Sequence, residues 1–427
     1  CHYFTKWRAD MKSYNAYLRE MSLMPHVYDM DKQGVKIDIV ALAKDLEVYS
    51  AELVRLDEKI CGILGATIDV DSNESLADAL EAAGKSKGFS LTATGKRSVA
   101  KGSLISAIND PGLLGALLIR NSLATCIRTF MQPWYDMASI QEDNKIFIRW
   151  NQVRNYSDTG ARTGRLSSSP NLQNVPTLWE QLIAQLEKLG YILDIAMPQV
   201  RKYIIPEPGN ILVSRDFSGQ EMRLLAHFAG GNLLKTLQNK PDADVHMIAA
   251  SIANISRRVA KTLGFAVLYG AGVGRIAETL GISAAEASEI KANYLNALPE
   301  IATLQRDVQY RGRNGMAITT LGGRHYFVEE PKLVQGRVRT FEYKLINYLI
   351  QGSAADQTKA AMEYYCKNTK HGKLLLSVHD ELVIECPIEH QEEESQLLSI
   401  AMATAFSDIL EYTSITTETR GFNFGEL

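Results

Sequence analysis

Two aspartates that are far apart in the sequence each stand where an apolar strand is predicted to reach a turn. Asp216 lies near the end of the apolar run 211–217, and Asp380 lies in the polar triplet inside the apolar stretch 373–387. Two carboxylates that share a site repel each other unless cations lie between them. Mg²⁺ binds few carboxylates and takes substrate phosphates as further ligands. A converging pair therefore predicts a two-metal site for phosphoryl transfer, whereas Asp216 alone is equally compatible with a helix N-cap.

A second group of residues recurs at intervals of four, namely Arg257, Lys261, Phe265 and Tyr269. Steps of four along a helix drift slowly, so these side chains share one broad face. Two cations followed by two aromatic rings suit a triphosphate at one end and a sugar and base at the other. The alternative is an amphipathic surface helix whose aromatic rings face the core.

The segments around these residues predict how they are positioned. The run 211–217 starts with β-branched residues and favours a buried strand, and helical periodicity begins at Gly219 and stops at a Gly-Gly pair, 230–231. The stretch 373–387 favours a tight hairpin with Asp380 at its turn. Two strand tips can bring their acids together if the strands are neighbours in one sheet.

The rest of the chain is predicted to be mainly helical. A short helix, a break at Gly34 and a brief extended piece are expected over 23–38. A long helix is predicted at 39–64, a short one at 72–83, and further helices at 104–131, 178–189, 342–365 and 391–412, with a helix-dominated region at 233–307. A strand is predicted at 145–153 and a hairpin at 319–327, and the polar stretch 159–176 predicts a long functional loop.

Composition narrows the class of protein. The 427 residues exceed one compact core and predict two to four lobes, and 46% hydrophobic with 22% charged residues is ordinary for globular proteins. Apolar runs stay well below 20 residues, so no membrane span is expected. Five cysteines without a CxxC pair argue against zinc and a disulfide framework and predict a reducing, intracellular compartment.

The net charge of −3 gives no overall sign of nucleic-acid binding, but charge is uneven along the chain. The segment 82–109 carries five basic residues and no acidic one. Such a segment predicts binding to the phosphate backbone of a nucleic acid, and a solvated basic loop is the alternative. The basic residues are Lys85, Lys87, Lys96, Arg97 and Lys101.

Four ordered motifs resemble those of the family A DNA polymerases over nearly the whole chain. DFSGQEMR (216–223) and SVHDELVIE (377–385) resemble the two palm motifs, RRVAKTLGFAVLYG (257–270) the fingers-helix motif, and RTGRLSSSPNLQNVP (162–176) the template-primer segment. The resemblance implies an α+β fold shaped like a right hand, with an antiparallel-sheet palm and mainly helical fingers and thumb. It divides the chain into an N-terminal lead-in segment (1–22), thumb (23–137), palm (138–220 and 344–427) and fingers (221–343).

The resemblance also implies roles for individual residues. Asp216 and Asp380 would bind two Mg²⁺ ions, with Mn²⁺ as an alternative, and Glu381 would be a nearby helper acid. Arg257 and Lys261 would hold the triphosphate, with Lys261 protonating the pyrophosphate leaving group. Phe265 would stack on the nucleotide, Tyr269 would guard the template slot, Glu221 would exclude a 2'-hydroxyl, and His246 would contact the triphosphate unless it is an ordinary core histidine. Primer-template contacts would come from Arg165, Asn347, Gln351 and His379, and from the basic loop through Lys85, Lys87, Lys96 and Arg97.

The implied activity is template-directed addition of deoxynucleotides to a primer 3'-hydroxyl, in replication or repair, in the cytoplasm or nucleoid. The Ser-Gly pair after Asp216 resembles phage replicative members more than bacterial repair enzymes. Tyr343 stands where bacterial members carry Arg, which puts one primer-template contact in question. Motifs of a 3'–5' exonuclease are not found, so any proofreading activity would lie upstream of Cys1 or in a partner. Helicase or processivity partners stay open. Rival interpretations are a single-subunit RNA polymerase and a catalytically silent DNA-binding scaffold.

Overall fold

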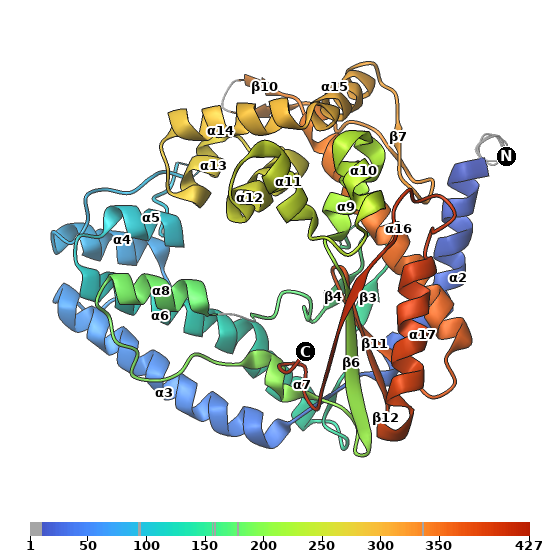
Figure 1. Ribbon diagram of the computed structural model, residues 1–427. Coiled ribbons are helices and arrows are strands. Elements are labelled where there is room, and N and C mark those ends of the chain that lie inside the picture. The colour runs from blue at the N-terminus through green and yellow to red at the C-terminus, as the bar shows by residue number, and fades with distance from the viewer. Residues whose placement is uncertain (1–10, 93–94, 156, 158, 177–178, 335–336) are drawn as a thin grey trace.

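A four-stranded antiparallel sheet stands at the centre of the computed structural model, which describes residues 11–92, 95–155, 157, 159–176, 179–334 and 337–427 (Figure 1). The strand order is β11 (Lys373–Val378), β12 (Glu381–Pro387), β6 (Asn210–Phe217) and β13 (Thr416–Gly421). The predicted strand 211–217 and the predicted hairpin 373–387 are both confirmed.

Strand β6 has neighbours on both sides. Its residues Ile211, Leu212 and Val213 are all buried, as the apolar, β-branched start of this stretch requires. The chain then turns at Gly219, which has φ +65° and begins α9 (Gln220–Ala229). A Cβ atom at this position would lie 2.8 Å from Val245 Cγ1, so the close approach as well as the left-handed backbone favours glycine.

Three helices pack around the sheet, and all lie near it in Figure 1. They are α2 (Met11–Gln33), α16 (Leu345–Asn368) and α17 (Gln391–Thr404). Helix α16 contacts α2, α17 and β11, while α17 also contacts β6 and α2 also contacts β11. Two polar residues of α16, Ser353 and Gln357, have no exposed surface, and both are hydrogen-bonded within the protein.

The segment after α2, residues 39–139, folds mainly as helices, most of them on the left of Figure 1. They are α3 (Ile39–Leu64), α4 (Asn73–Ala82), α5 (Lys101–Ala107), α6 (Pro111–Cys126), the π-helical turn η1 (Ile127–Met131) and α7 (Gln132–Ser139), with α8 (Glu180–Lys188) packed on α6. The short strands β1 (Val35–Ile37), β2 (Lys145–Ile146) and β5 (Ile204–Ile205) form a three-stranded sheet in the order β2-β1-β5.

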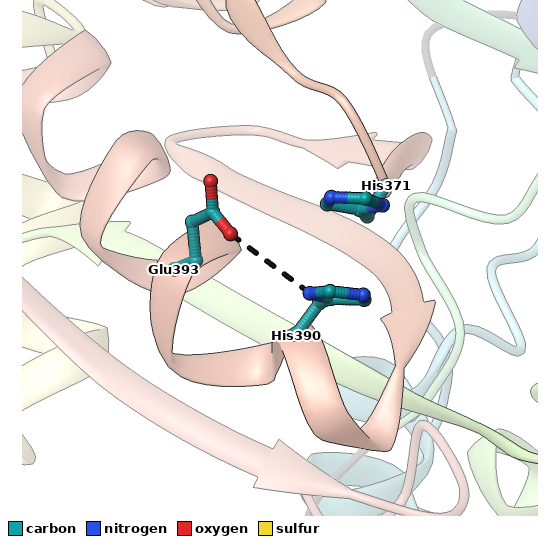
Figure 2. A group of neighbouring side chains, drawn as sticks. All are labelled: His371, His390 and Glu393. Atoms are coloured by element: carbon teal, nitrogen blue, oxygen red, sulfur yellow. Dashed lines mark ion pairs between the residues drawn. The ribbon is translucent and has the colours of Figure 1, made fainter.

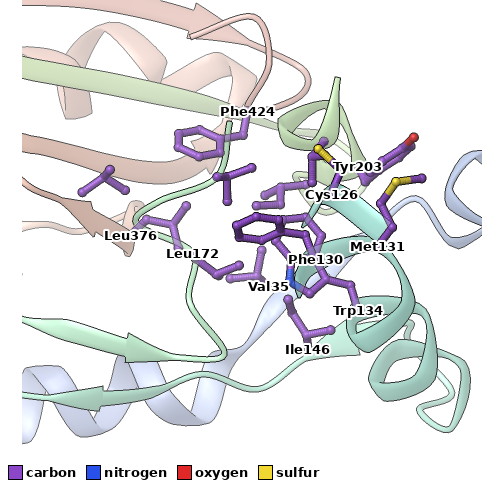
Figure 3. Close-up of a cluster of buried hydrophobic side chains, with 14 of the residues drawn as sticks. Val35, Cys126, Phe130, Met131, Trp134, Ile146, Leu172, Tyr203, Leu376 and Phe424 are labelled. Carbon is purple, nitrogen blue, oxygen red and sulfur yellow. The ribbon is translucent and has the colours of Figure 1, made fainter. Parts of the chain in front are cut away.

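One hydrophobic core joins these helices to the central sheet. Trp134 and Phe130 pack edge to face, with ring centroids 6.0 Å apart, and belong to the same buried cluster as Leu376 of β11 and Phe424 (Figure 3). Within the described residues, one helical stretch, Pro111–Ser139, is long and apolar enough to span a membrane, but 72% of its most apolar window is buried inside the protein. Core helices meet the same length and composition criterion.

A second core lies among the helices at the top of Figure 1. They are α9, α10 (Gly231–Asn239), α11 (Val245–Ala253), α12 (Arg257–Leu268), α13 (Val273–Leu280), α14 (Ala284–Ala297) and α15 (Pro299–Arg313). Leu345 and Leu349 of α16 and Leu410 join the same core. The predicted division into thumb, palm and fingers, with its boundaries, stays a prediction.

The remaining strands are short. Strand β3 (Arg149–Asn151) pairs with β4 (Ser167–Ser169), β7 (Ile318–Thr319) with β8 (His325–Tyr326), and β9 (Lys332–Val334) with β10 (Arg337–Arg339). Short 3-10 turns precede β5 at Val200–Tyr203, α16 at Glu342–Lys344 and α17 at Ile388–His390.

Several predicted boundaries were wrong. The first helix extends upstream of residue 23 and is described from Met11 onward. The predicted helix 104–131 is broken before Pro111, whose Asp110 neighbour caps a new helix that then runs on to Ser139. The predicted strand 145–153 is two short strands, and the last helix ends at Thr404 and not at residue 412.

Candidate active site

The two predicted acids meet at one edge of the central sheet. Strands β6 and β12 pair with Asp216 directly opposite Glu381, and the Phe217 amide donates a hydrogen bond of 3.2 Å to the Asp380 carbonyl. Asp380 and His379 form the two-residue turn between β11 and β12, and His379 takes the left-handed conformation with φ +59°. The pairing of β6 with β12 thus brings together two acids that are 164 residues apart in the sequence.

Burial and like charge dominate the electrostatics of this edge. Burial, the neighbouring charges of Asp380 and Glu381, and a side-chain hydrogen bond with Asp380 raise the pKa of Asp216 to about 8. Burial also raises the pKa of Glu381, whose carboxylate accepts a hydrogen bond from the Ser214 hydroxyl. Crowded carboxylates with a raised pKa are hard oxygen ligands that gain most when a cation relieves their repulsion, so the donor set fits divalent ions such as Mg²⁺.

The predicted cationic and aromatic face exists on α12. Ser256 caps the helix by accepting a hydrogen bond from the Val259 amide, and Arg257 and Lys261 are exposed in its first two turns. Phe265 and Tyr269 follow, with stacked rings whose centroids are 6.0 Å apart. The opposite face of the helix is buried in the second core, so the helix is amphipathic with its cations turned outward.

His246 lies beside this aromatic pair. Its ring is buried, with its centroid 5.8 Å from that of Phe265, and its Nδ1 has no hydrogen-bond partner among the described residues. Burial lowers the pKa of His246, which favours the neutral ring at pH 7. Asp244 caps the helix of His246 and pairs with Arg257 at 2.6 Å, so the cation and the histidine are held by one carboxylate.

Glu221 is the centre of a hydrogen-bonded group that joins four predicted site residues. Its buried carboxylate accepts from Arg165 at 2.5 Å and from the Tyr269 hydroxyl at 3.2 Å. The Gln351 amide donates to Tyr269 at 3.0 Å and to Glu221 at 3.3 Å. Residues from the long loop, α9, α12 and α16 are therefore fixed relative to one another, close to the aromatic pair.

The other predicted DNA contacts are placed less uniformly. His379 adjoins Asp380, and burial and the Arg165 charge lower the pKa of its ring. The buried Nδ2 of Asn347 has no partner within the part of the chain that the structure covers. The Tyr343 ring packs against Gly270, just after the end of α12. A Cβ atom on Gly270 would lie 2.6 Å from Tyr343 Cδ2.

The basic loop is partly neutralised within the protein. Arg97 pairs with Glu74, Asp78 and Glu81 at 2.6–2.9 Å. Lys85 pairs with Asp110 at 2.8 Å. Lys87 and Lys96 are exposed, so they are the members of the predicted set best placed to meet an external phosphate.

Three supporting residues were missed from the sequence. Ser214 lies two residues before Asp216 on the same face of β6, a spacing that could have identified it. Asp244 precedes a helix, and Asp is a common N-cap residue, but its pairing with Arg257 is not visible in the sequence. Arg201 lies over the Phe424 ring with its charge close to Glu381, a contact between distant segments that leaves no local signal.

Comparisons with known proteins agree with this architecture. The family model for DNA polymerase family A matches residues 41–418. The chain is 30% identical over 391 residues to a thermostable DNA polymerase I of Thermus filiformis, covering 88% of this chain and 44% of the relative. It is 29% identical over 438 residues to DNA polymerase I of Chloroflexus aurantiacus, covering 96% of this chain and 43% of the relative. The chain thus spans less than half the length of these relatives.

A solved structure has the same fold. The POL domain of Pol1 from M. smegmatis, in complex with DNA primer-template and dNTP, superimposes with a TM-score of 0.81 and 24% sequence identity. The match covers 95% of this chain and 70% of that chain. The relatives named here are bacterial, and the predicted closer likeness to phage replicative members stays a prediction.

Proposed function

The chain belongs to DNA polymerase family A, and from that premise we propose that it extends a DNA primer by adding deoxynucleotides copied from a template strand. The observation that carries the proposal is the meeting of Asp216 and Asp380 at the tips of two hydrogen-bonded strands. The cationic face of α12 and the group around Glu221 supply the other parts that such a reaction needs. The wider activity and partners of the longer relatives are no part of the proposal.

The acid pair would hold the metal ions of this reaction. Two Mg²⁺ ions, or Mn²⁺ in their place, supply charge neutralisation and polarise phosphate oxygens when they are bound between carboxylates. Asp216 must lose its proton for this, and its raised pKa measures how strongly the protein alone opposes two charged carboxylates there. Glu381, held by Ser214, adds negative potential beside the pair.

Arg257 and Lys261 would bind the triphosphate of the incoming nucleotide. Both are exposed on one face of α12, and their charges stabilise the negative charge that develops on the phosphates during in-line transfer. The Lys261 ammonium group can also donate a proton to the departing pyrophosphate oxygen. Asp244 holds Arg257 in place by its ion pair. The neutral His246 ring, in the tautomer protonated at Nδ1, can donate a hydrogen bond from this nitrogen to a phosphate oxygen.

Phe265 and Tyr269 would form the wall against which the sugar and base stack. Glu221 lies behind Tyr269 and is tied by Arg165 and Gln351, so its carboxylate cannot swing away from the ring. A carboxylate fixed there opposes a sugar with a 2'-hydroxyl by steric exclusion and favours deoxynucleotides.

The primer-template would lie along the loop and turn that carry Arg165 and His379, with the exposed Lys87 and Lys96 following duplex phosphates. Phosphate contacts position nucleic acid without reading its sequence, so affinity would be independent of sequence and would fall with added salt. The buried Nδ2 of Asn347 has no hydrogen-bond partner among the described residues, so this amide group could donate one hydrogen bond to the duplex.

Primer extension with a labelled primer-template and Mg²⁺ tests the proposal. Asp380→Asn preserves side-chain shape and removes one charge, so extension should fall by at least a thousandfold while duplex binding stays within about twofold of wild type. Asp307→Asn is the matched control, since this exposed carboxylate on α15 pairs only with Arg311 among the described ion pairs. Near-normal extension by Asp380→Asn would refute the role of the acid pair.

A comparison of deoxynucleotide with ribonucleotide incorporation distinguishes the proposed DNA polymerase from the rival interpretation, a single-subunit RNA polymerase. Wild-type protein should incorporate deoxynucleotides over ribonucleotides, since Glu221 is held against Tyr269. Preference for ribonucleotides would favour the rival interpretation. Duplex binding without any extension would instead favour the silent scaffold.

A further inference from the structure

Three potential metal ligands gather at the far end of the palm hairpin from the acid pair. His371 lies in the turn before β11, His390 ends the 3-10 turn after β12, and Glu393 lies in the first turn of α17 (Figure 2). Strands β11 and β12 run between this cluster and Asp380. At about 3.3 Å per residue over about six residues, the two sites are roughly 20 Å apart. The cluster is therefore separate from the proposed catalytic edge.

The geometry of the cluster is compact. The two imidazole rings stack with centroids 3.6 Å apart and planes within 4° of parallel. His390 Nδ1 lies 3.9 Å from Glu393 Oε2, and one ligand atom from each residue lies within 4.8 Å of the others. His371 and Glu393 are exposed and His390 is half-buried, so solvent can reach the cluster.

A buried carboxylate fixes the turn that carries His371. Glu394 is buried and accepts hydrogen bonds from the His371 amide at 2.9 Å, the Thr369 hydroxyl at 2.7 Å and the Tyr365 hydroxyl at 2.6 Å. A Cβ on Gly372 would lie 1.9 Å from the Tyr365 hydroxyl oxygen, so the turn has room for glycine only. The backbone of His371 is thus held in place by Glu394, and metal sites depend on such interactions to position their ligands.

We propose that His371, His390 and Glu393 bind one divalent transition-metal ion of the zinc class, with water completing the coordination. Two imidazoles and one carboxylate are the ligands such ions prefer, whereas Mg²⁺ prefers oxygen ligands alone. Zinc bonds of about 2.0–2.1 Å place tetrahedral ligands about 3.4 Å apart. The exposed His371 and Glu393 need to close by about 1.5 Å at most to reach that spacing, and the stacked rings need to tilt so that both nitrogens face the ion.

Such an ion would join two segments that approach each other only in the folded protein. It would tie the turn before β11 to the start of α17 and so brace the end of the sheet opposite Asp380. Lys370 Nζ lies 3.9 Å from Glu393 Oε1, and the ion would displace this weak contact. The expected role is structural, because no residue of the proposed catalytic edge belongs to the cluster.

Zn²⁺ titration of the full chain by calorimetry tests the proposal, after metal is stripped with a chelator. The Asp216→Asn/Asp380→Asn background removes the competing carboxylate pair. We expect one equivalent to bind, with affinity reduced more than tenfold by His390→Ala or His371→Ala and to a smaller degree by Glu393→Gln. His325→Ala, which alters an exposed histidine on β8, is the matched control and should bind as the background does. Co²⁺ in place of Zn²⁺ should give visible d–d absorption bands that His390→Ala abolishes.

Two outcomes would overturn the site. One is the lack of saturable Zn²⁺ binding by the background protein, and the other is affinity that is unchanged in both histidine variants. Circular dichroism of each variant checks the fold, and the exposed His371 gives a variant that leaves the core intact if His390→Ala unfolds. Primer extension by the histidine variants in the wild-type background should match wild type, which keeps this test independent of the proposed polymerase activity.

Discussion

The raised pKa of Asp216 predicts how the metal-free protein responds to pH. The carboxyl has an ordinary value of 3.8 and a value of about 8 in the folded protein. Between these two values the folded protein holds a proton that the unfolded chain has released. Stability is therefore greatest at low pH within this window and falls as pH rises through it, because ∂ΔG/∂pH follows the difference in bound protons.

The size of the effect follows from one proton. A full proton difference changes the free energy of unfolding by about 1.4 kcal/mol per pH unit. Asp216 is only partly enclosed and shares its site with Asp380, so we expect about half of that value, or roughly 1–2 kcal/mol between pH 5 and pH 7. The dependence should level off above about pH 8, where the folded protein has lost the proton as well.

Urea unfolding in the presence of EDTA measures this effect. Wild type and Asp216→Asn are compared at pH 5, 6, 7, 8 and 9. The new amide does not titrate, and the comparison cancels the contribution of groups that do not interact with Asp216. Wild type should lose stability relative to Asp216→Asn up to about pH 8, and excess Mg²⁺ should reduce that loss by favouring the charged pair. Stability curves that stay parallel over the whole range would refute the argument that burial and like charge hold the proton.

Three further changes test other parts of the structure. Glu221→Ala should raise ribonucleotide incorporation at least tenfold, and Glu221→Gln less, in single-nucleotide extension assays; unchanged sugar selectivity would remove the gate. Gly322→Ala should destabilise the protein by about 2–3 kcal/mol in urea unfolding, because the new Cβ would lie 2.4 Å from Cγ of buried Asp356; a cost below about 0.5 kcal/mol would show that the site relaxes freely. The double variant Lys87→Ala/Lys96→Ala should weaken duplex binding at low salt. The slope of log affinity against log salt concentration should become shallower by the amount expected for about two lost phosphate contacts, and an unchanged slope would mean that these lysines do not contact the DNA.

The elements that carry chemistry could be predicted from the sequence to a large degree. The strand at 211–217 and the hairpin at 373–387 each have a continuous apolar run bounded by polar turn residues, so local pattern identifies them. The face of α12 follows from spacing by four. The sequence alone did not show that Asp216 and Asp380 lie close together. Hydrophobic periodicity and strand propensity do not say which strands are neighbours in a sheet, so the prediction had to assume this pairing.

The remaining parts depend on contacts between distant segments. Arg97 was predicted as a phosphate contact from a stretch without acids, yet its partners Glu74, Asp78 and Glu81 come from the preceding helix. The group around Glu221 joins four segments, and none of its members predicts the others. The helix boundary at Thr404 was missed because the apolar periodicity continues into a turn that packs on the second core.

The pairing of β6 between β12 and β13 has a consequence for biosynthesis. Asp216 pairs in register with Glu381 and with Thr417, so its partners leave the ribosome long after it does. At about 5–20 residues per second, the roughly 200 residues to Thr417 take on the order of 10–40 s to translate. Both edges of β6 lack a partner until β12 emerges, and the edge that pairs with β13 lacks one until the end of the interval. Chaperone dependence during translation should therefore concentrate on this segment and end when the C-terminal strand emerges.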